Sequence, residues 1–154
     1  MHPSVTAMWR EYCALREPST DALPSSWHFC DNEQDANECA RLVREGRKRA
    51  TSPSLWYFES RDEPLPRAGD LHVVTNWAGE AQCVIRTTHV VIVPFDQVSE
   101  EHARAEGEGD GTLAWWRDVH WSYYHRELDG SGFEPRRDMP IVCEYFERVY
   151  PPLA

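Results

Sequence analysis

Residues 71–95 have the sequence LHVVTNWAGEAQCVIRTTHVVIVPF, and this stretch decides the predicted fold. Three runs within it are rich in Val, Ile and Thr, which are typical of β-strands: residues 71–77, 81–85 and 88–95. Residues 78–80 include a glycine and predict a hairpin turn. A further strand is predicted near the end of the chain, at residues 140–149. Several strands with few helices predict a small curled sheet or barrel.

Four segments outside these strands have the apolar spacing of amphipathic helices: residues 5–16, 31–45, 99–106 and 112–128. Asp31, Asn32 or Asp35 can cap the second of them. Four shorter segments connect these elements: residues 18–26 as a loop, 27–30 as a short strand or helix entry, 55–58 as an apolar cluster and 63–70 as a turn-rich connector. The chain therefore predicts both helices and a sheet.

The segment Glu45-Gly46-Arg47-Lys48-Arg49-Ala50-Thr51 follows the second predicted helix. Gly46 lies just past the helix end, where glycine accepts a left-handed conformation without steric cost. Lys48 and Thr51 then follow in an extended run. These two side chains are the chain's best candidates for chemistry.

The length of 154 residues predicts one domain over residues 1–154, with a helix and loop at residues 1–24 packed on the rest. Seven tryptophans, six tyrosines and five phenylalanines exclude a disordered chain. The apolar runs are far shorter than the roughly 20 residues of a membrane helix, and residues 1–3 begin no signal sequence. We therefore expect a soluble, cytoplasmic protein without a membrane partner.

The charge balance bears on possible partners. Sixteen basic and twenty-six acidic residues give a net charge of −10, which disfavours tight, sequence-blind binding to long nucleic acids. Five basic residues within nine positions form either a local basic patch or a solvated helix face: Arg41, Arg44, Arg47, Lys48 and Arg49.

No metal or cofactor is expected. The five cysteines are odd in number and form no C-x-x-C pair, which favours free thiols over disulfides or a zinc site. His102, His120 and His125 lack a tight ligand pattern.

Several motifs together resemble the ASCH-domain family, which is related to PUA-type RNA-binding barrels. They are Gly46-x-Lys48-x-x-Thr51, Pro64-Leu65-Pro66-x-x-Gly69-Asp70, the strands from Cys83 to Phe95, Glu101-His102-Ala103-x-x-Glu106, and Trp116-Arg117-x-Val119-His120-Trp121. The resemblance covers about residues 27–150 and is greatest to the longer bacterial members. It implies an α+β fold, a PUA-like small β-barrel of about five or six strands with flanking helices.

The resemblance also implies candidate activities. Some ASCH proteins are amidohydrolases that remove the acyl group from N4-acetylcytidine and related nucleosides, and their lysine, threonine and glutamate match Lys48, Thr51 and Glu106. Others resemble ribonucleases or RNA-binding modules, so the implied partner is a modified nucleoside or RNA. An arginine common in the family is replaced here by Pro53. The substrate contacts in that corner must therefore differ.

Two mechanisms are open for an amidohydrolase. In one, neutral Lys48 takes the proton of Thr51, which attacks the acyl carbon, and Glu106 passes a proton to the leaving nitrogen. In the other, Glu106 activates water while charged Lys48 holds the oxyanion. The predicted substrate-binding residues are aromatic side chains that can stack on a pyrimidine, together with one arginine: Trp27, Phe29, Trp56, Tyr57 and Arg49.

Overall fold

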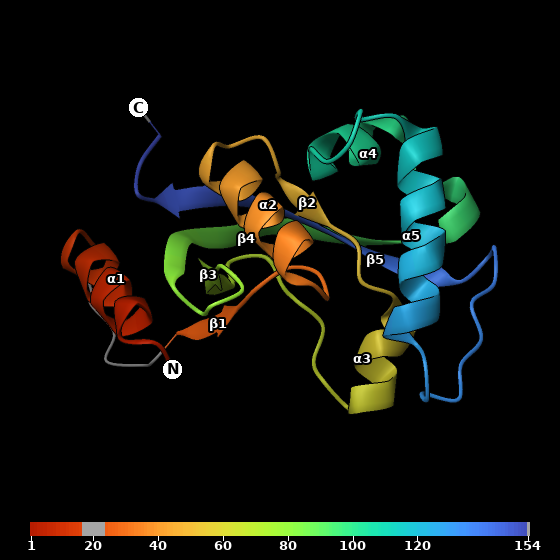
Figure 1. The fold of residues 1–154 in the computed structure, drawn as a ribbon, viewed down its shortest axis with the longest axis horizontal. Helices are drawn as coiled ribbons and strands as arrows, with labels where there is room; N and C mark the ends of the chain where they lie inside the picture. Colours follow the sequence, from red (N-terminus) through yellow and green to blue (C-terminus); the bar gives the residue numbers. More distant parts are fainter. Residues whose placement is uncertain (17–23, 154) are drawn as a thin grey trace.

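The computed structural model describes residues 1–16 and 24–153 and contains one mixed sheet in the order β1-β3-β4-β5-β2. β1 (Ser25–Trp27) runs parallel to β3 (Leu71–Thr75), while the other neighbours are antiparallel: β4 (Ala81–Pro94), β5 (Pro140–Tyr150) and β2 (Ala50–Thr51). Figure 1 shows β4 and β5 as the long strands that run through the molecule.

The α+β class with five strands and flanking helices is confirmed. Among the described residues β1 and β2 form the two edges and do not pair with each other, so the sheet does not close into a hydrogen-bonded ring. The predicted hairpin is confirmed, because Gly79 has φ +87° and Asn76 and Glu80 close the turn between β3 and β4.

One boundary prediction was wrong. The runs predicted at residues 81–85 and 88–95 form a single strand, β4, whose pairing with β5 is continuous except for register shifts. One of these shifts lies between Thr87 and His89. A β-bulge inserts one extra residue and bends a strand without ending it, so the polar residues here mark a bend rather than a break.

The predicted helices are confirmed with small changes at their ends: α1 (Pro3–Ala14), α2 (Glu33–Arg44), α4 (Glu100–Glu106) and α5 (Leu113–Glu127). Asn32 caps α2, since its side chain accepts a hydrogen bond from the Asp35 N–H at 2.9 Å. A fifth helix, α3 (Leu55–Arg61), occupies the segment predicted only as an apolar cluster. Its N-terminus is capped by Ser54, whose Oγ accepts from the Tyr57 N–H.

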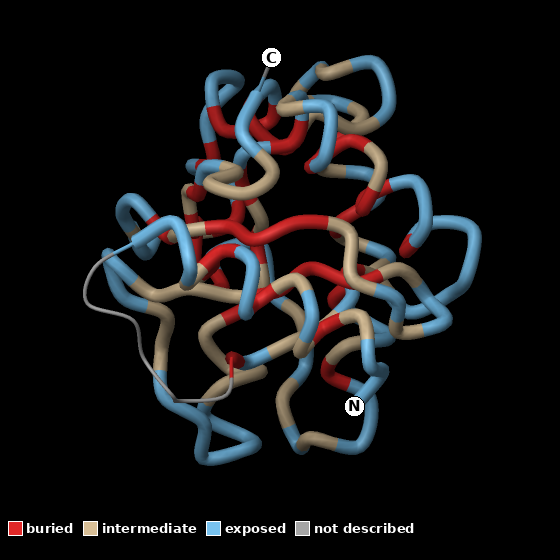
Figure 2. Tube along the Cα trace, turned by 90° about the vertical axis from the view of Figure 1, so that its left-hand side faces the viewer, coloured by how far each residue is buried: buried red, intermediate tan, exposed pale blue. Residues whose placement is uncertain are grey.

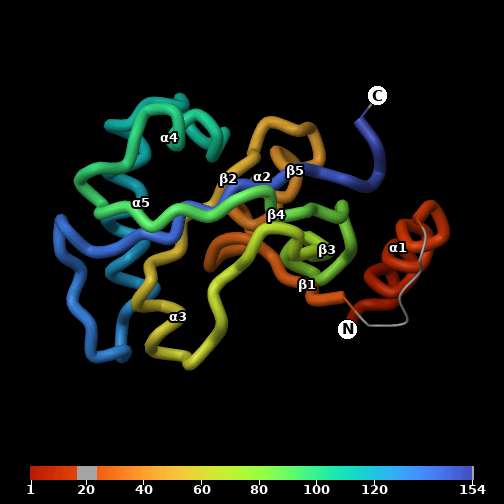
Figure 3. Tube along the Cα trace, turned by 180° about the vertical axis from the view of Figure 1, so that it is seen from behind, coloured from red at the N-terminus to blue at the C-terminus, as the bar shows by residue number. Residues whose placement is uncertain are grey.

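Three groups of apolar side chains hold the helices to the sheet. α5 packs through Trp116 and Tyr124, with the following Leu128, against Phe95 and Ile141. α2 packs through Cys39, Ala40 and Val43 against β3, β4 and β5. α1 packs on the opposite face of β3 and β4, through Val73 and Val84 rather than the intervening Val74, Cys83 and Ile85. Figure 3 shows α1 beside these two strands. Figure 2 shows the buried stretches gathered in the interior, with exposed loops around them.

α1 packs on the sheet through Val5, Trp9 and Tyr12. Most of the loop predicted at residues 18–26 lies outside the described residues, and its last two positions were predicted wrongly, because Ser25 and Ser26 belong to β1. Within the part of the chain that the structure describes, none of the helices has the length and apolar character needed to cross a membrane.

Candidate active-site cleft

The segment that follows α2 is fixed between two helices. Gly46 has φ +79°, as its position at the helix end predicted. The N–H groups of Arg47 and Lys48 both donate to the Leu42 carbonyl, and the Arg49 N–H donates to the carbonyl of Ala105 on α4. The Lys48 backbone is therefore held by α2 on one side and by α4 on the other.

The side chain of Lys48 is only 2% exposed, and its ammonium group lies between two carboxylates. Its Nζ donates to Glu106 Oε2 at 2.9 Å and to Glu108 Oε2 at 2.8 Å. A third bond goes to the Ala50 carbonyl at 2.9 Å. Three strong acceptors thus surround a cation that is almost fully removed from water.

Gly107 explains how the two carboxylates reach Lys48. It ends α4 with φ +70°, and a Cβ atom on it would lie 2.5 Å from the Arg47 carbonyl oxygen. The turn from Glu106 to Glu108 therefore packs directly on the Lys48 segment, which only glycine permits.

The charges in this cluster determine its protonation. Burial by itself lowers the pKa of Lys48, but the Glu106 and Glu108 carboxylates outweigh it and raise that pKa well above its usual value. Burial raises the pKa of Glu106, yet the Lys48 ammonium prevails and lowers it to about 2. Burial raises the pKa of Glu108. Lys48 is therefore a cation beside ionised Glu106.

A chain of hydrogen bonds ends on the other oxygen of Glu106. The Ser52 hydroxyl donates to Glu106 Oε1 at 2.5 Å and contacts His102 Nε2 at 2.5 Å, while His102 Nδ1 contacts the Tyr145 hydroxyl at 3.0 Å. Burial and the nearby Lys48 charge lower the pKa of His102 to about 3, so the ring is neutral. The consistent tautomer has the proton on Nε2, donated to Ser52, and Nδ1 accepting from Tyr145.

His120 on α5 approaches the cluster from the cleft side. Its Nδ1 lies 2.9 Å from the Trp116 carbonyl, which can only accept, so Nδ1 carries a proton. Its Nε2 lies 3.8 Å from Glu106 Oε1. His102 Nε2 lies at the same distance from this oxygen, so two imidazole rings flank Glu106 Oε1.

The cluster forms the floor of a cleft of about 630 Å³. All three predicted catalytic residues, Lys48, Thr51 and Glu106, contribute to its lining. Three of the predicted substrate-binding residues also line it: Trp27, Phe29 and Tyr57. The Trp27 and Phe29 rings meet edge to face at 4.8 Å, and Lys48 Nζ lies 5.2 Å from the Phe29 ring centre. The cleft therefore has a charged floor and aromatic walls.

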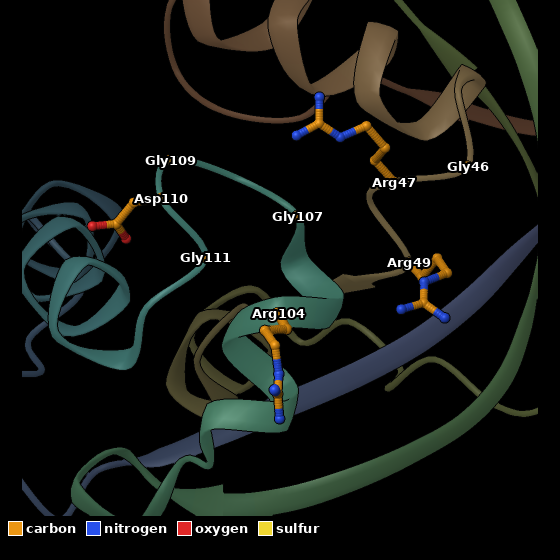
Figure 4. A pocket seen from close by; sticks show the side chains of 8 residues that line it. All are labelled: Gly46, Arg47, Arg49, Arg104, Gly107, Gly109, Asp110 and Gly111. Carbon is orange, nitrogen blue, oxygen red and sulfur yellow. The ribbon is translucent and has the colours of Figure 1, made fainter.

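Two predicted substrate-binding residues lie elsewhere. Trp56 stacks on Phe133 with ring centres 5.0 Å apart and belongs to the packing around α5. Arg49 faces a separate hollow of about 380 Å³ that it shares with Arg47 and Arg104. Figure 4 shows that these three guanidinium groups do not converge on one point. The prediction that Trp56 and Arg49 bind the substrate does not agree with these positions.

The five basic residues at positions 41–49 were expected to form either a local basic patch or a solvated helix face. Lys48 is buried, and Arg41 is paired with Glu38 at 2.6 Å and with Glu45 at 2.7 Å. Arg47 and Arg49 are exposed. The arginines on α2 therefore belong in part to a solvated helix face.

Four side chains of the site were not assigned to catalysis from the sequence: Ser52, Glu108, His102 and His120. Ser52 directly follows Thr51, and Glu108 follows Glu106 across a glycine, so both stood beside a predicted residue. His102 was considered only as a metal ligand. Its role in the hydrogen-bond chain requires contact with Ser52, fifty positions away, which no local pattern reveals.

The comparisons with known proteins agree with this architecture. The family model described as ASCH domain matches residues 25–150. A crystal structure of an ASCH domain from Lactobacillus crispatus JV V101 has 38% sequence identity and a TM-score of 0.90, covering 97% of this chain and 96% of that one. A crystal structure of a protein from Enterococcus faecalis V583 has 33% identity and a TM-score of 0.88, covering 97% and 90%.

The search of curated proteins found no match. The matched range nevertheless agrees closely with the range over which the motifs resembled the family, and it contains the whole Lys48 cluster. The chain therefore belongs to the ASCH domain family.

Proposed function

We propose that the protein is an amidohydrolase that acts on N4-acylated cytosine nucleosides such as N4-acetylcytidine. The observation that carries this proposal is the buried ammonium of Lys48, held by Glu106 and Glu108 at the floor of an aromatic-walled cleft. Family membership supports a hydrolase in general, and the residues of the cleft support the amide substrate.

Hydrolysis of an N4-acyl amide requires stabilisation of an oxyanion and a base for the nucleophile. The Lys48 ammonium stabilises the negative charge that develops on the carbonyl oxygen when one of its three N–H groups turns from its present acceptor to that oxygen. A neighbouring carboxylate accepts the proton of the attacking water as the bond from oxygen to the acyl carbon forms. The bond from carbon to N4 then breaks, and the proton passes to the leaving nitrogen. The products are a carboxylic acid and the cytosine nucleoside.

The charged state of Lys48 favours one of the two mechanisms expected from the sequence. A lysine whose pKa is raised by two carboxylates cannot take the proton of Thr51. Thr51 lines the cleft and remains an alternative nucleophile, but its base is then Glu106. We therefore assign Lys48 to the oxyanion and Glu106 to proton transfer.

The lining of the cleft suits a small neutral ligand. Trp27, Phe29 and Tyr57 offer ring faces and edges for a pyrimidine. Seven carboxylate side chains and only three lysine or arginine side chains line the described cleft. Phosphate groups bind where basic residues predominate. This charge balance favours a nucleoside over RNA as the ligand.

The test is incubation with N4-acetylcytidine, with released cytidine measured by liquid chromatography. We expect turnover by the wild type and a loss of about 100- to 1,000-fold in Lys48→Met and Glu106→Gln, a size typical of a removed oxyanion donor. Arg47→Met removes the same charge one residue earlier at an exposed position and serves as the matched control, with activity expected to be unchanged. Circular dichroism establishes that each variant is folded.

Two results would overturn the proposal: no turnover by the wild type, or full turnover by folded Lys48→Met. Labelled single-stranded RNA tests the alternative in the same experiment. Cleavage of this RNA by the wild type but not by Lys48→Met would identify a ribonuclease. Salt-dependent RNA binding without either reaction would identify a binding module.

A further inference from the structure

Beside the Lys48 cluster, three ligand-forming side chains gather at the same floor of the cleft. They are Cys30 from the loop between β1 and α2, Cys39 from α2, and Glu108 from the turn after α4. The two Sγ atoms are 3.5 Å apart, and Cys39 Sγ lies 3.1 Å from Glu108 Oε1. One ligand atom from each residue lies within 4.8 Å of the others.

We propose that Cys30, Cys39 and Glu108 bind a zinc ion. Zinc lies about 2.3 Å from thiolate sulfur and about 2.1 Å from carboxylate oxygen, and it prefers tetrahedral geometry. These values require separations of about 3.8 Å between two sulfurs and about 3.6 Å between sulfur and oxygen. The observed 3.5 and 3.1 Å are shorter by a few tenths of an ångström. An outward movement of a few tenths of an ångström corrects these two separations, and the third, between Cys30 Sγ and the Glu108 oxygen, lies within 4.8 Å and has to be about 3.6 Å when the ion is bound.

The backbone at Cys30 supports a function for this position. Cys30 has φ +64°, in the left-handed region that a cysteine rarely adopts. Such conformations persist where the surroundings fix them, and they are concentrated at functional sites. Here the next two residues are anchored, because Asp31 pairs with Arg126 at 2.7 Å and Asn32 caps α2. The loop therefore holds the Cys30 sulfur close to α2.

Lys48 orients the carboxylate ligand. Its ammonium donates a hydrogen bond to Glu108 Oε2 at 2.8 Å, and Glu108 Oε1 therefore points toward Cys39 Sγ. Outer partners, which are residues that hydrogen-bond to a metal ligand without touching the metal, fix the orientation of that ligand and increase the affinity for the metal. A divalent ion would offset the charge of the two thiolates, while Lys48 remains the shared cation of Glu106 and Glu108.

The position of the three ligands indicates the type of site. All of them line the cleft, so a fourth ligand would come from water or from a bound molecule. Three protein ligands with one open position are typical of zinc sites that take part in chemistry, whereas structural zinc sites have four protein ligands. This inference revises the expectation of free thiols without a metal, and it does not depend on the proposed amidohydrolase activity.

The test uses the full chain, reduced with a phosphine and freed of metal by a chelator. We expect one zinc ion per chain by isothermal titration calorimetry. Cobalt(II) in its place should give the near-ultraviolet absorption of thiolate-to-metal charge transfer. Cys39→Ser and Cys30→Ser should each weaken zinc binding by more than the roughly 10- to 100-fold that loss of an outer partner costs.

Cys13→Ser is the matched control, because Cys13 lies in α1 and packs with the Val5, Trp9 and Tyr12 cluster, away from the cleft. Its zinc affinity should equal that of the wild type. The proposal is overturned if the wild type binds no zinc, if cobalt binds without charge-transfer absorption, or if Cys13→Ser weakens binding as much as Cys39→Ser does. The cobalt spectrum of the wild type decides the question even if a serine variant does not fold.

Discussion

Glu127 provides the sharpest test of the electrostatics in this structure, and we expect Glu127→Gln to stabilise the protein at alkaline pH. The residue lies on α5, where its Oε1 accepts from the Ser54 hydroxyl at 3.0 Å and from the Ser54 N–H at 3.2 Å. Its Oε2 is buried and has no hydrogen-bond partner among the described residues. Burial outweighs the Ser54 hydrogen bonds and raises the pKa of Glu127 to about 7.

The sign of the effect follows from proton linkage. Because the pKa of Glu127 in the folded state is raised above its usual 4.5, its stabilising contribution is complete below about pH 4.5 and is lost as the pH rises through 7. The rise to about 7 corresponds to at most about 3 kcal/mol of unfolding free energy. Glutamine retains an acceptor for Ser54 and never ionises. Wild type and Glu127→Gln should therefore be similar at pH 5, with the variant more stable at pH 8 by up to about 3 kcal/mol.

Urea unfolding followed by tryptophan fluorescence at pH 5 and pH 8 measures this difference. Glu59→Gln is the matched control, because Glu59 is exposed on α3 and loses the same charge. It should change stability by less than about 0.5 kcal/mol at both pH values. A stability difference between wild type and Glu127→Gln that does not change with pH would refute the reasoning.

Three further substitutions test the packing of the cleft floor by urea unfolding at pH 7. Lys48→Met leaves buried Glu106 and partly buried Glu108 without their cation and should cost about 3 to 5 kcal/mol; an equal effect of Arg47→Met, at an exposed position, would contradict this. Tyr124→Phe removes the hydroxyl that donates to the Ser52 carbonyl at 2.8 Å and should cost about 1 to 3 kcal/mol, so an unchanged midpoint would count against that bond. Gly107→Ala should destabilise by at least about 1 kcal/mol, because its Cβ would collide with the Arg47 backbone; a neutral result would show that α4 does not pack as described.

The sequence predicted most of the elements because their signals are local. Strand composition identified β3, β4 and β5, and the spacing of apolar residues identified four helices. α3 was missed because residues 55–58 form too short an apolar run to distinguish helix from strand. The decisive local feature is Ser54, whose side chain caps the helix. Serine is also common in turns, so the sequence alone does not identify Ser54 as a helix cap.

Lys48 and Thr51 were singled out by their place after the helix-ending Gly46, whereas Glu106 was predicted only from the resemblance to the family. All three line the cleft. Trp56 was misassigned because aromatic residues serve equally well in a core and in a stacking site, and its partner Phe133 is distant in sequence. Glu108 was not predicted because its importance comes from the approach of α4 to the Lys48 segment. That approach depends on Gly107, whose missing side chain leaves no signal in the pattern of charges.

The Lys48 cluster is better explained by function than by stability. A buried ion pair loses the hydration of both charges, and replacement by apolar residues of similar volume is often neutral or stabilising. Here one ammonium and two carboxylates lie together at the floor of a cleft, next to two thiols. The fold maintains this arrangement through two backbone features. Cys30 and Gly107 both have positive φ values, and both positions therefore limit which residues can stand there. Such restrictions are expected where a site must hold charged groups ready for a ligand, since pre-organised charges need not rearrange during the reaction.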